Sequence, residues 1–114
     1  MSETAPEPEP AYHLHLDADE TPVAASALRL LIVDEAHQPE IRALAREVLA
    51  GAEGTPDERG GVTVGLSPPQ MKIAHSALRS LLNDLGREQE DERVVLRRIL
   101  DKLPDEHTMR AIEL

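Results

Sequence analysis

Residues 62–70 read Val-Thr-Val-Gly-Leu-Ser-Pro-Pro-Gln, and this stretch contains both kinds of local structure that the fold requires. Its apolar residues alternate with small or polar ones, and a period of two predicts a strand with one buried face. Ser67 then stands at a helix N-cap, with proline next and Gln70 three positions on, which is the pattern of a capping box. The stretch therefore predicts a strand that leads directly into a helix.

The same order of features occurs once before, about fifty residues earlier. Residues 12–16 alternate apolar residues with two histidines, and residues 26–29 (Ser-Ala-Leu-Arg) recur as residues 76–79. A collinear match through strand, cap and two helices predicts an internal duplication. After one inserted residue the match continues in the second helix, where it pairs Arg42 with Arg93, Arg46 with Arg97, Val48 with Ile99 and Leu49 with Leu100.

Stretches rich in proline and glycine divide the chain into segments. Residues 1–11 alternate proline and glutamate and predict a disordered acidic tail, and residues 51–61 predict a flexible linker. We expect a first β-α-α unit over residues 12–50 and a second over residues 62–104. Residues 105–114 are expected to form a C-terminal tail or a short strand.

The expected fold class is α+β, mostly α, with two tandem β-α-α units packed as one domain with pseudo-two-fold symmetry. The sequence allows two positions for the start of the first helix. Asp17 and Glu20 repeat the places of the capping residues, but Pro22 would then lie too deep in the helix. In the alternative, Thr21 is the cap and Pro22 follows it.

The composition excludes several classes of protein. The 114 residues include no cysteine, which rules out disulfides, thiolate zinc sites and a cysteine nucleophile. The sequence has no signal-peptide pattern and no apolar run of membrane-spanning length, so we expect a cytoplasmic protein without a membrane partner. A formal net charge of −10 disfavours binding to DNA or to anionic lipid.

The acidic charge is unevenly distributed. Residues 12–50 contain seven acids and three bases, a net charge of −4, whereas residues 62–103 contain six acids and seven bases, a net charge of +1. The bases of the second unit could form a modest basic face, although a solvated helix surface explains them as well.

One strand followed by two helices resembles the ribbon-helix-helix family over Tyr12 to Leu103. The resemblance rests on the order and length of the elements. It implies an antiparallel ribbon formed by the two strands and four helices around a shared core, here as an intrachain pseudo-dimer. In that family the outward strand residues read DNA in the major groove.

Carried over by position, those outward residues are His13, His15, Thr63 and Gly65. A DNA reader is expected to show Arg, Lys, Asn or Gln there, so this chain departs from the family pattern. The second helices would also begin among carboxylates, including Glu40, which repel phosphate. DNA binding is therefore possible by analogy and disfavoured by charge.

No group of residues predicts catalysis. His13 and His15 have a spacing seen in metal sites, and a site needs a third or fourth ligand. His75 or Asp17 could be recruited, but nothing in the spacing requires it. No nucleophile, carboxylate pair or phosphate loop stands in the context that its chemistry requires. We expect a non-enzymatic protein without a metal or cofactor.

Val23, Ile73 and Val94 lie off the main apolar stripes of their helices. Either the interior wraps further round these helices, or these residues form a surface for a partner or a homodimer. The leading hypothesis is a small protein-interaction or regulatory module that uses these positions or the strand residues His13, His15 and Thr63. The alternatives are a ribbon-helix-helix DNA-binding regulator or antitoxin, and a self-assembling structural oligomer.

Overall fold

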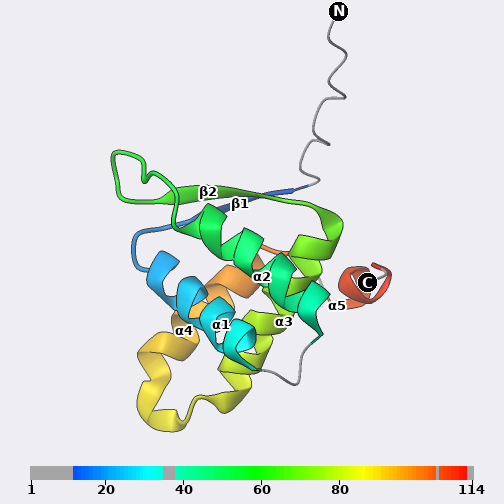
Figure 1. The fold of residues 1–114 in the computed structure, drawn as a ribbon. Helices are drawn as coiled ribbons and strands as arrows, with labels where there is room; N and C mark the ends of the chain where they lie inside the picture. The colour runs from blue at the N-terminus through cyan, green and yellow to red at the C-terminus, as the bar shows by residue number, and fades with distance from the viewer. Residues whose placement is uncertain (1–11, 35–37, 105, 113–114) are drawn as a thin grey trace, which may run out of the picture.

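The computed structural model describes residues 12–34, 38–104 and 106–112 (Figure 1). The predicted acidic tail, residues 1–11, lies outside the described residues. The elements are β1 (Tyr12–Leu16), α1 (Thr21–Val33), α2 (Pro39–Ala52), β2 (Val62–Leu66), α3 (Pro68–Asp84), the 3-10 turn η1 (Arg87–Gln89), α4 (Glu90–Asp101) and α5 (Glu106–Arg110). The prediction of an α+β fold that is mostly helical is confirmed.

The two strands pair with each other in one antiparallel ribbon, which lies across one side of the helices (Figure 1). The register sets Tyr12 opposite Leu66 and Leu16 opposite Val62. Alternate side chains point to opposite faces, so one face is apolar and buried while the other is open to solvent. The buried face consists of Leu14, Leu16, Val62, Val64 and Leu66.

The predicted capping box of the second unit is confirmed. Ser67 Oγ accepts the Gln70 N–H at 3.3 Å, and Gln70 Oε1 accepts the Ser67 N–H at 2.9 Å. In the first unit the helix begins at Thr21 with Pro22 in its first turn. Glu20 still makes half of a capping box, because its Oε1 accepts the Asp17 N–H at 2.7 Å.

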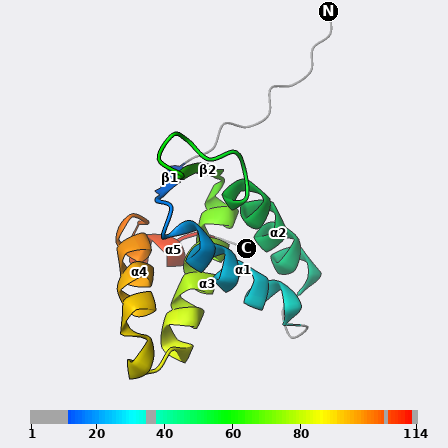
Figure 2. The same ribbon diagram turned by 90° about the vertical axis from the view of Figure 1, so that its left-hand side faces the viewer.

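Helices α1 and α3 run side by side under the ribbon, and α2 and α4 lie on opposite sides of this pair (Figure 2). Small residues permit the close approach of α1 and α3, because an alanine side chain adds little width to a helix. Ala27 of α1 and Ala77 of α3 are both 2% exposed and line the same space between the helices.

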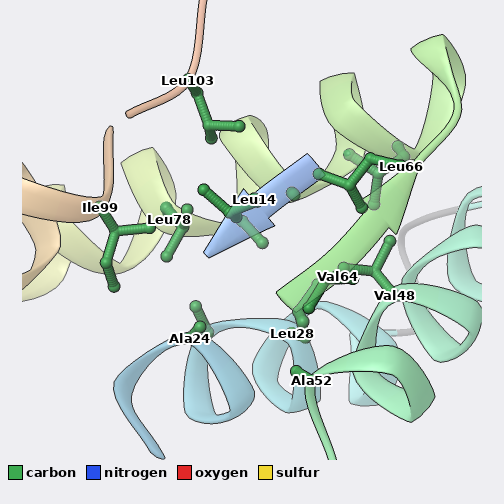
Figure 3. Close-up of a cluster of buried hydrophobic side chains, with 14 of the residues drawn as sticks. Leu14, Ala24, Leu28, Val48, Ala52, Val64, Leu66, Leu78, Ile99 and Leu103 are labelled. Atoms are coloured by element: carbon green, nitrogen blue, oxygen red, sulfur yellow. The ribbon is translucent and has the colours of Figure 1, made fainter. Parts of the chain in front are cut away.

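The core receives side chains from the ribbon and from all four longer helices (Figure 3). Leu14 of β1 lies among Leu78 of α3, Ile99 of α4 and Leu103, while Val64 of β2 faces Val48 of α2 (Figure 3). Burial of each large aliphatic side chain contributes about 1.5 to 3 kcal/mol. The core therefore joins residues from both halves of the chain and contains no buried aromatic side chain among the described residues.

One expected boundary differs from the structure. Helix α2 continues through Gly51 to Ala52, so the linker begins later than predicted. A Cβ at Gly51 would lie 2.8 Å from Val64 Cγ1, which explains a glycine inside the helix: it lets α2 pack closely on β2. The following loop is ordered by Asp57, whose Oδ1 accepts the N–H groups of Arg59 and Gly61.

The C-terminal segment forms a short helix, α5, in place of the strand that was one of its two expected forms. Its Met109 is 3% exposed and belongs to the core. Lys72 Nζ donates to the Ile112 carbonyl at 2.6 Å and ties the end of this segment to α3. The alternation of apolar residues at 109, 111 and 112 did not indicate a helix, because five residues are too few to show a helical period.

Candidate functional site

The outer face of the ribbon carries the strand residues that the sequence singled out. His13, His15, Thr63 and Gly65 are all exposed there. His13 lies opposite Gly65, and His15 lies opposite Thr63. The structure therefore brings the three predicted side chains, His13, His15 and Thr63, onto one surface.

His15 makes two polar contacts on this face. Its Nδ1 lies 3.1 Å from Thr63 Oγ1 across the ribbon, and its Nε2 lies 3.4 Å from Asp17 Oδ1. The imidazole therefore holds the two strands together at their surface. Within the described part of the chain, no three His, Cys, Asp or Glu side chains gather as a metal site requires.

The three off-stripe apolar residues have different environments. Ile73 is 3% exposed and belongs to the core, so it is not available to a partner in this fold. Val23 is half-buried against the core. Val94 alone of the three is open, with 49% of its surface exposed. The buried surface of α1 and α3 therefore covers more of each helix than a single apolar stripe would.

Two exposed apolar residues were not singled out from the sequence. Leu30 is 53% exposed and Val33 is 71% exposed, both near the end of α1. The signal was present in residues 28–33 (Leu-Arg-Leu-Leu-Ile-Val), because five apolar residues among six cannot all face one side of a helix.

A groove of about 220 Å³ lies between α1 and α3, and Leu30 forms part of its wall. Small residues, including Ala27 and Ala77, line it. Leu31 and Leu81 add apolar surface from the two helices, and Ser76 and Ser80 add hydroxyl groups. We call this the α1–α3 groove.

Two aspartates border the α1–α3 groove. Asp34 and Asp84 both line it, and each lies at the C-terminal end of one of the two helices. A helix C-terminus carries partial negative charge, and neither helix has a basic residue in its last turn to offset it. The groove can therefore hold an apolar group that carries a positive charge beside it.

The most deeply buried charged side chain lies at the junction of β1 and α1. Glu20 is fully buried. Arg98 Nε donates to its Oε2 at 2.9 Å, and Lys102 Nζ donates to its Oε1 at 2.5 Å. Arg98 also donates to Asp19 Oδ2 at 2.5 Å. These bonds connect the first turn of α1 to α4, some eighty residues further along the chain.

Opposing effects act on the pKa of Glu20. Burial alone would raise this pKa, but hydrogen bonds from Lys102, from the Asp17 N–H and from Arg98 outweigh it, so the pKa lies below its ordinary value. The hydrogen bond from Arg98 also lowers the pKa of Asp19. The same carboxylates raise the pKa of Arg98. Glu20, Asp19 and Arg98 are therefore ionised at neutral pH.

A neutral counterpart lies at the junction of β2 and α3. Gln70 Nε2 donates to Glu47 Oε2 of α2 at 2.9 Å. Gln70 lies fifty positions after Glu20, and Glu47 lies fifty-one positions before Arg98. Each junction thus reaches the second helix of the other half of the chain.

Comparison with protein-family models, with curated proteins and with solved structures gives no match. In the described part of the chain, no helix has both the length and the apolar character needed to cross a membrane.

Proposed function

We propose that this protein is a non-enzymatic, cytoplasmic protein-interaction module that binds an amphipathic, basic helix of a partner in the α1–α3 groove. The observation that carries the proposal is the exposure of Leu30 and Val33 beside a groove with carboxylates from two helices. A contiguous exposed apolar patch marks an interaction site, whereas single exposed apolar residues are ordinary. Leu30 and Val33 are three positions apart in α1, so they lie on one face of the helix.

The chemistry of the groove defines the partner. A helix that docks in a groove presents apolar residues at positions three or four apart, and Leu30, Leu31 and Leu81 give this groove apolar surface to receive them. Lysine or arginine on the flanks of that helix would face Asp34 and Asp84. The net charge of −10 increases the rate of encounter with such a basic segment.

We also propose that the two halves are tandem copies related by a pseudo-two-fold axis, as in the ribbon-helix-helix resemblance. Antiparallel pairing of β1 with β2 supports this proposal. So do the reciprocal contacts of Glu20 with Arg98 and of Gln70 with Glu47, because equivalent positions reach each other across the molecule. The groove residues follow the same relation, since Asp34 and Asp84 are fifty positions apart.

DNA binding by the ribbon remains a second candidate because His13, His15 and Thr63 share its exposed face. The contacts and charges around the ribbon disfavour DNA binding. His15 already contacts Thr63 and Asp17, and the carboxylate of Asp57 lies in the loop that enters β2. Phosphates approaching the ribbon would meet these carboxylates.

The test is capture of partners by the tagged full-length chain from cells, with co-purified protein and nucleic acid quantified before and after nuclease. A double variant, Leu30→Ala with Val33→Ala, removes the exposed apolar surface, and Val94→Ala is the matched control on α4. We expect one stoichiometric protein that survives nuclease, is lost from the double variant and is retained by the control. Crosslinking should place a basic helical segment of that protein beside Asp34 or Asp84.

Several outcomes would overturn the proposal. Equal capture by the double variant would move the interaction away from the groove. DNA that is removed by nuclease and lost on His13→Ala would make the ribbon the functional surface. A chain that captures only its own copies, and becomes monomeric on Val94→Glu, would make self-assembly the function.

A further inference from the structure

The two walls of the α1–α3 groove differ in chemistry, although matching positions of the chain form them. At the offset of fifty residues, the groove is lined by two pairs of identical apolar residues, Ala27 with Ala77 and Leu31 with Leu81. A further lining pair at this offset is unlike, because Leu30 of α1 corresponds to Ser80 of α3. An apolar side chain on the α1 wall thus corresponds to a hydroxyl group on the α3 wall.

The next turn of each helix extends the same difference. Val33 follows Leu30 by three positions on α1, so these two residues lie on one face of the helix. Asn83 follows Ser80 by three positions on α3 in the same way. All four side chains are exposed. We call Leu30 and Val33 the α1 ridge, which is apolar, and Ser80 and Asn83 the α3 ridge, which carries neutral hydrogen-bonding groups.

A helix seated in the groove would remove both ridges from water at once. Contact of the α1 ridge with an apolar side chain is favourable in proportion to the apolar area that is buried. The α3 ridge would instead lose its hydrogen bonds to water, and a buried hydroxyl or amide costs free energy unless the ligand supplies a new partner. The two ridges therefore favour two different kinds of side chain on the same ligand.

We propose that the α1–α3 groove selects a partner helix with two distinct stripes. Apolar residues of that helix face the α1 ridge, and asparagine, glutamine, serine or threonine residues face the α3 ridge. The inference rests on the proposed function, because it concerns the same groove, and it adds a neutral polar stripe to the basic helix described above. It also fixes the direction of the partner helix, because turning that helix end for end would place each stripe against the wrong ridge.

Two synthetic helical peptides of equal charge test this selection. Each has leucines three and four positions apart and flanking lysines, and the row beside the leucines is glutamine in one peptide and leucine in the other. Fluorescence anisotropy measures the affinity of each peptide for the full-length chain. We expect the wild type to bind the glutamine peptide about tenfold more tightly than the leucine peptide, which is the effect of one hydrogen bond left unmade.

A double variant, Ser80→Leu with Asn83→Val, gives the α3 ridge the side chains of the α1 ridge. It should reverse the preference, so that the leucine peptide binds about tenfold more tightly than the glutamine peptide. Thr63→Val is the matched control, because Thr63 carries an exposed hydroxyl on the ribbon, outside the groove. This control should keep the preference of the wild type. Thermal melting establishes that the variants fold.

The outcomes separate this inference from the proposed function. Equal affinity of the wild type for the two peptides, or an unchanged preference in the Ser80→Leu, Asn83→Val variant, would overturn the polar stripe. The proposed function would still stand if the Leu30→Ala, Val33→Ala variant bound both peptides more weakly. Unchanged affinity of that variant, or no binding of either peptide to the wild type, would overturn the proposed function together with the inference.

Discussion

At the junction of β1 with α1, Glu20 accepts the Asp17 N–H and then reaches Arg98 and Lys102. At the junction of β2 with α3, Gln70 accepts the Ser67 N–H and then reaches Glu47. The two junctions share a local design, in which a side chain three residues into the turn bonds back to the backbone.

The difference lies in what the rest of each side chain does. Glu20 is buried and charged, so the free-energy cost of burying its carboxylate has to be offset by the cations at α4. Gln70 is neutral and its contact with Glu47 is exposed to solvent. The comparison teaches that the same cap can be either a local feature or a tertiary connection, according to burial and charge. Four predictions test this difference.

The largest effect is expected from Arg98→Ala. It removes one of the two cationic partners of the buried Glu20 carboxylate, so we expect the free energy of unfolding to fall by more than for any variant below. Urea denaturation measures it. Arg97→Ala is the control, because Arg97 lies 3.7 Å from the exposed Glu90 and such a pair contributes about 0.5 kcal/mol or less. Equal losses in both variants would contradict the special role of the Glu20 cluster.

Glu20→Gln makes the first junction chemically like the second. Neutral hydrogen bonds replace charged ones, so we expect a loss of about 1 to 2 kcal/mol at pH 7. The free energy of unfolding of this variant should also depend less on pH. The folded-state pKa of Glu20 lies below its ordinary value of 4.5, so the stability it contributes is complete above that value.

As pH falls, that contribution is lost through the folded-state pKa, because the unfolded chain takes up the proton first. Urea midpoints measured from pH 7 to pH 3 should therefore converge for the wild type and Glu20→Gln at the acid end. Some acid dependence should persist in the variant, because Asp19 and Asp57 also have lowered pKa values. Parallel curves for the two proteins would contradict the pKa shift of Glu20.

The local cap gives a smaller effect. Ser67→Ala removes the side-chain acceptor for the Gln70 N–H and should cost about 1 kcal/mol. Asp17→Ala at the equivalent place should cost less, because no side-chain hydrogen bond caps α1. Thermal melting of both variants compares them directly. A larger loss for Asp17→Ala would mean that its side chain, and not only its backbone N–H, stabilises the first junction.

The smallest effect is expected for Glu47→Ala, which removes only the exposed partner of Gln70. We expect a change of about 0.5 kcal/mol or less in the free energy of unfolding, because exposed polar pairs exchange readily with water. Addition of 0.5 M salt should leave the difference unchanged, since the Gln70 side chain is neutral. A loss as large as that of Arg98→Ala would make the two junctions equivalent.

Much of the backbone could be predicted from short-range patterns. Alternation in residues 12–16 and 62–66 indicated both strands, and the Ser67 and Gln70 pair indicated the start of α3. The strand residues His13, His15 and Thr63 were correctly expected on the open face of a ribbon. These features depend on residues within a few positions of one another, so a short stretch of sequence is enough to predict them.

The candidate binding sites were less accessible to prediction. Ile73 was a candidate surface residue but is buried, whereas Leu30 and Val33 were not singled out and are exposed. Which side of a helix is buried depends on where its neighbours cross it, and periodicity alone does not contain that information. A hollow lined by Lys72 of α3 and Arg110 of α5 has its second wall only because the C-terminal segment forms a helix, which the sequence did not predict.

The amino-acid sequence by itself determined the strands, the helix starts, the net negative charge and the lack of thiol chemistry, because each follows from composition or from contacts a few residues long. Only the tertiary structure decided that Glu20 is buried against Arg98 and Lys102, that α1 and α3 border an acidic groove, and that bases from α3 and α5 meet in one hollow. Those features join residues far apart in the chain, and their energies depend on burial, which exists only once the helices have packed together.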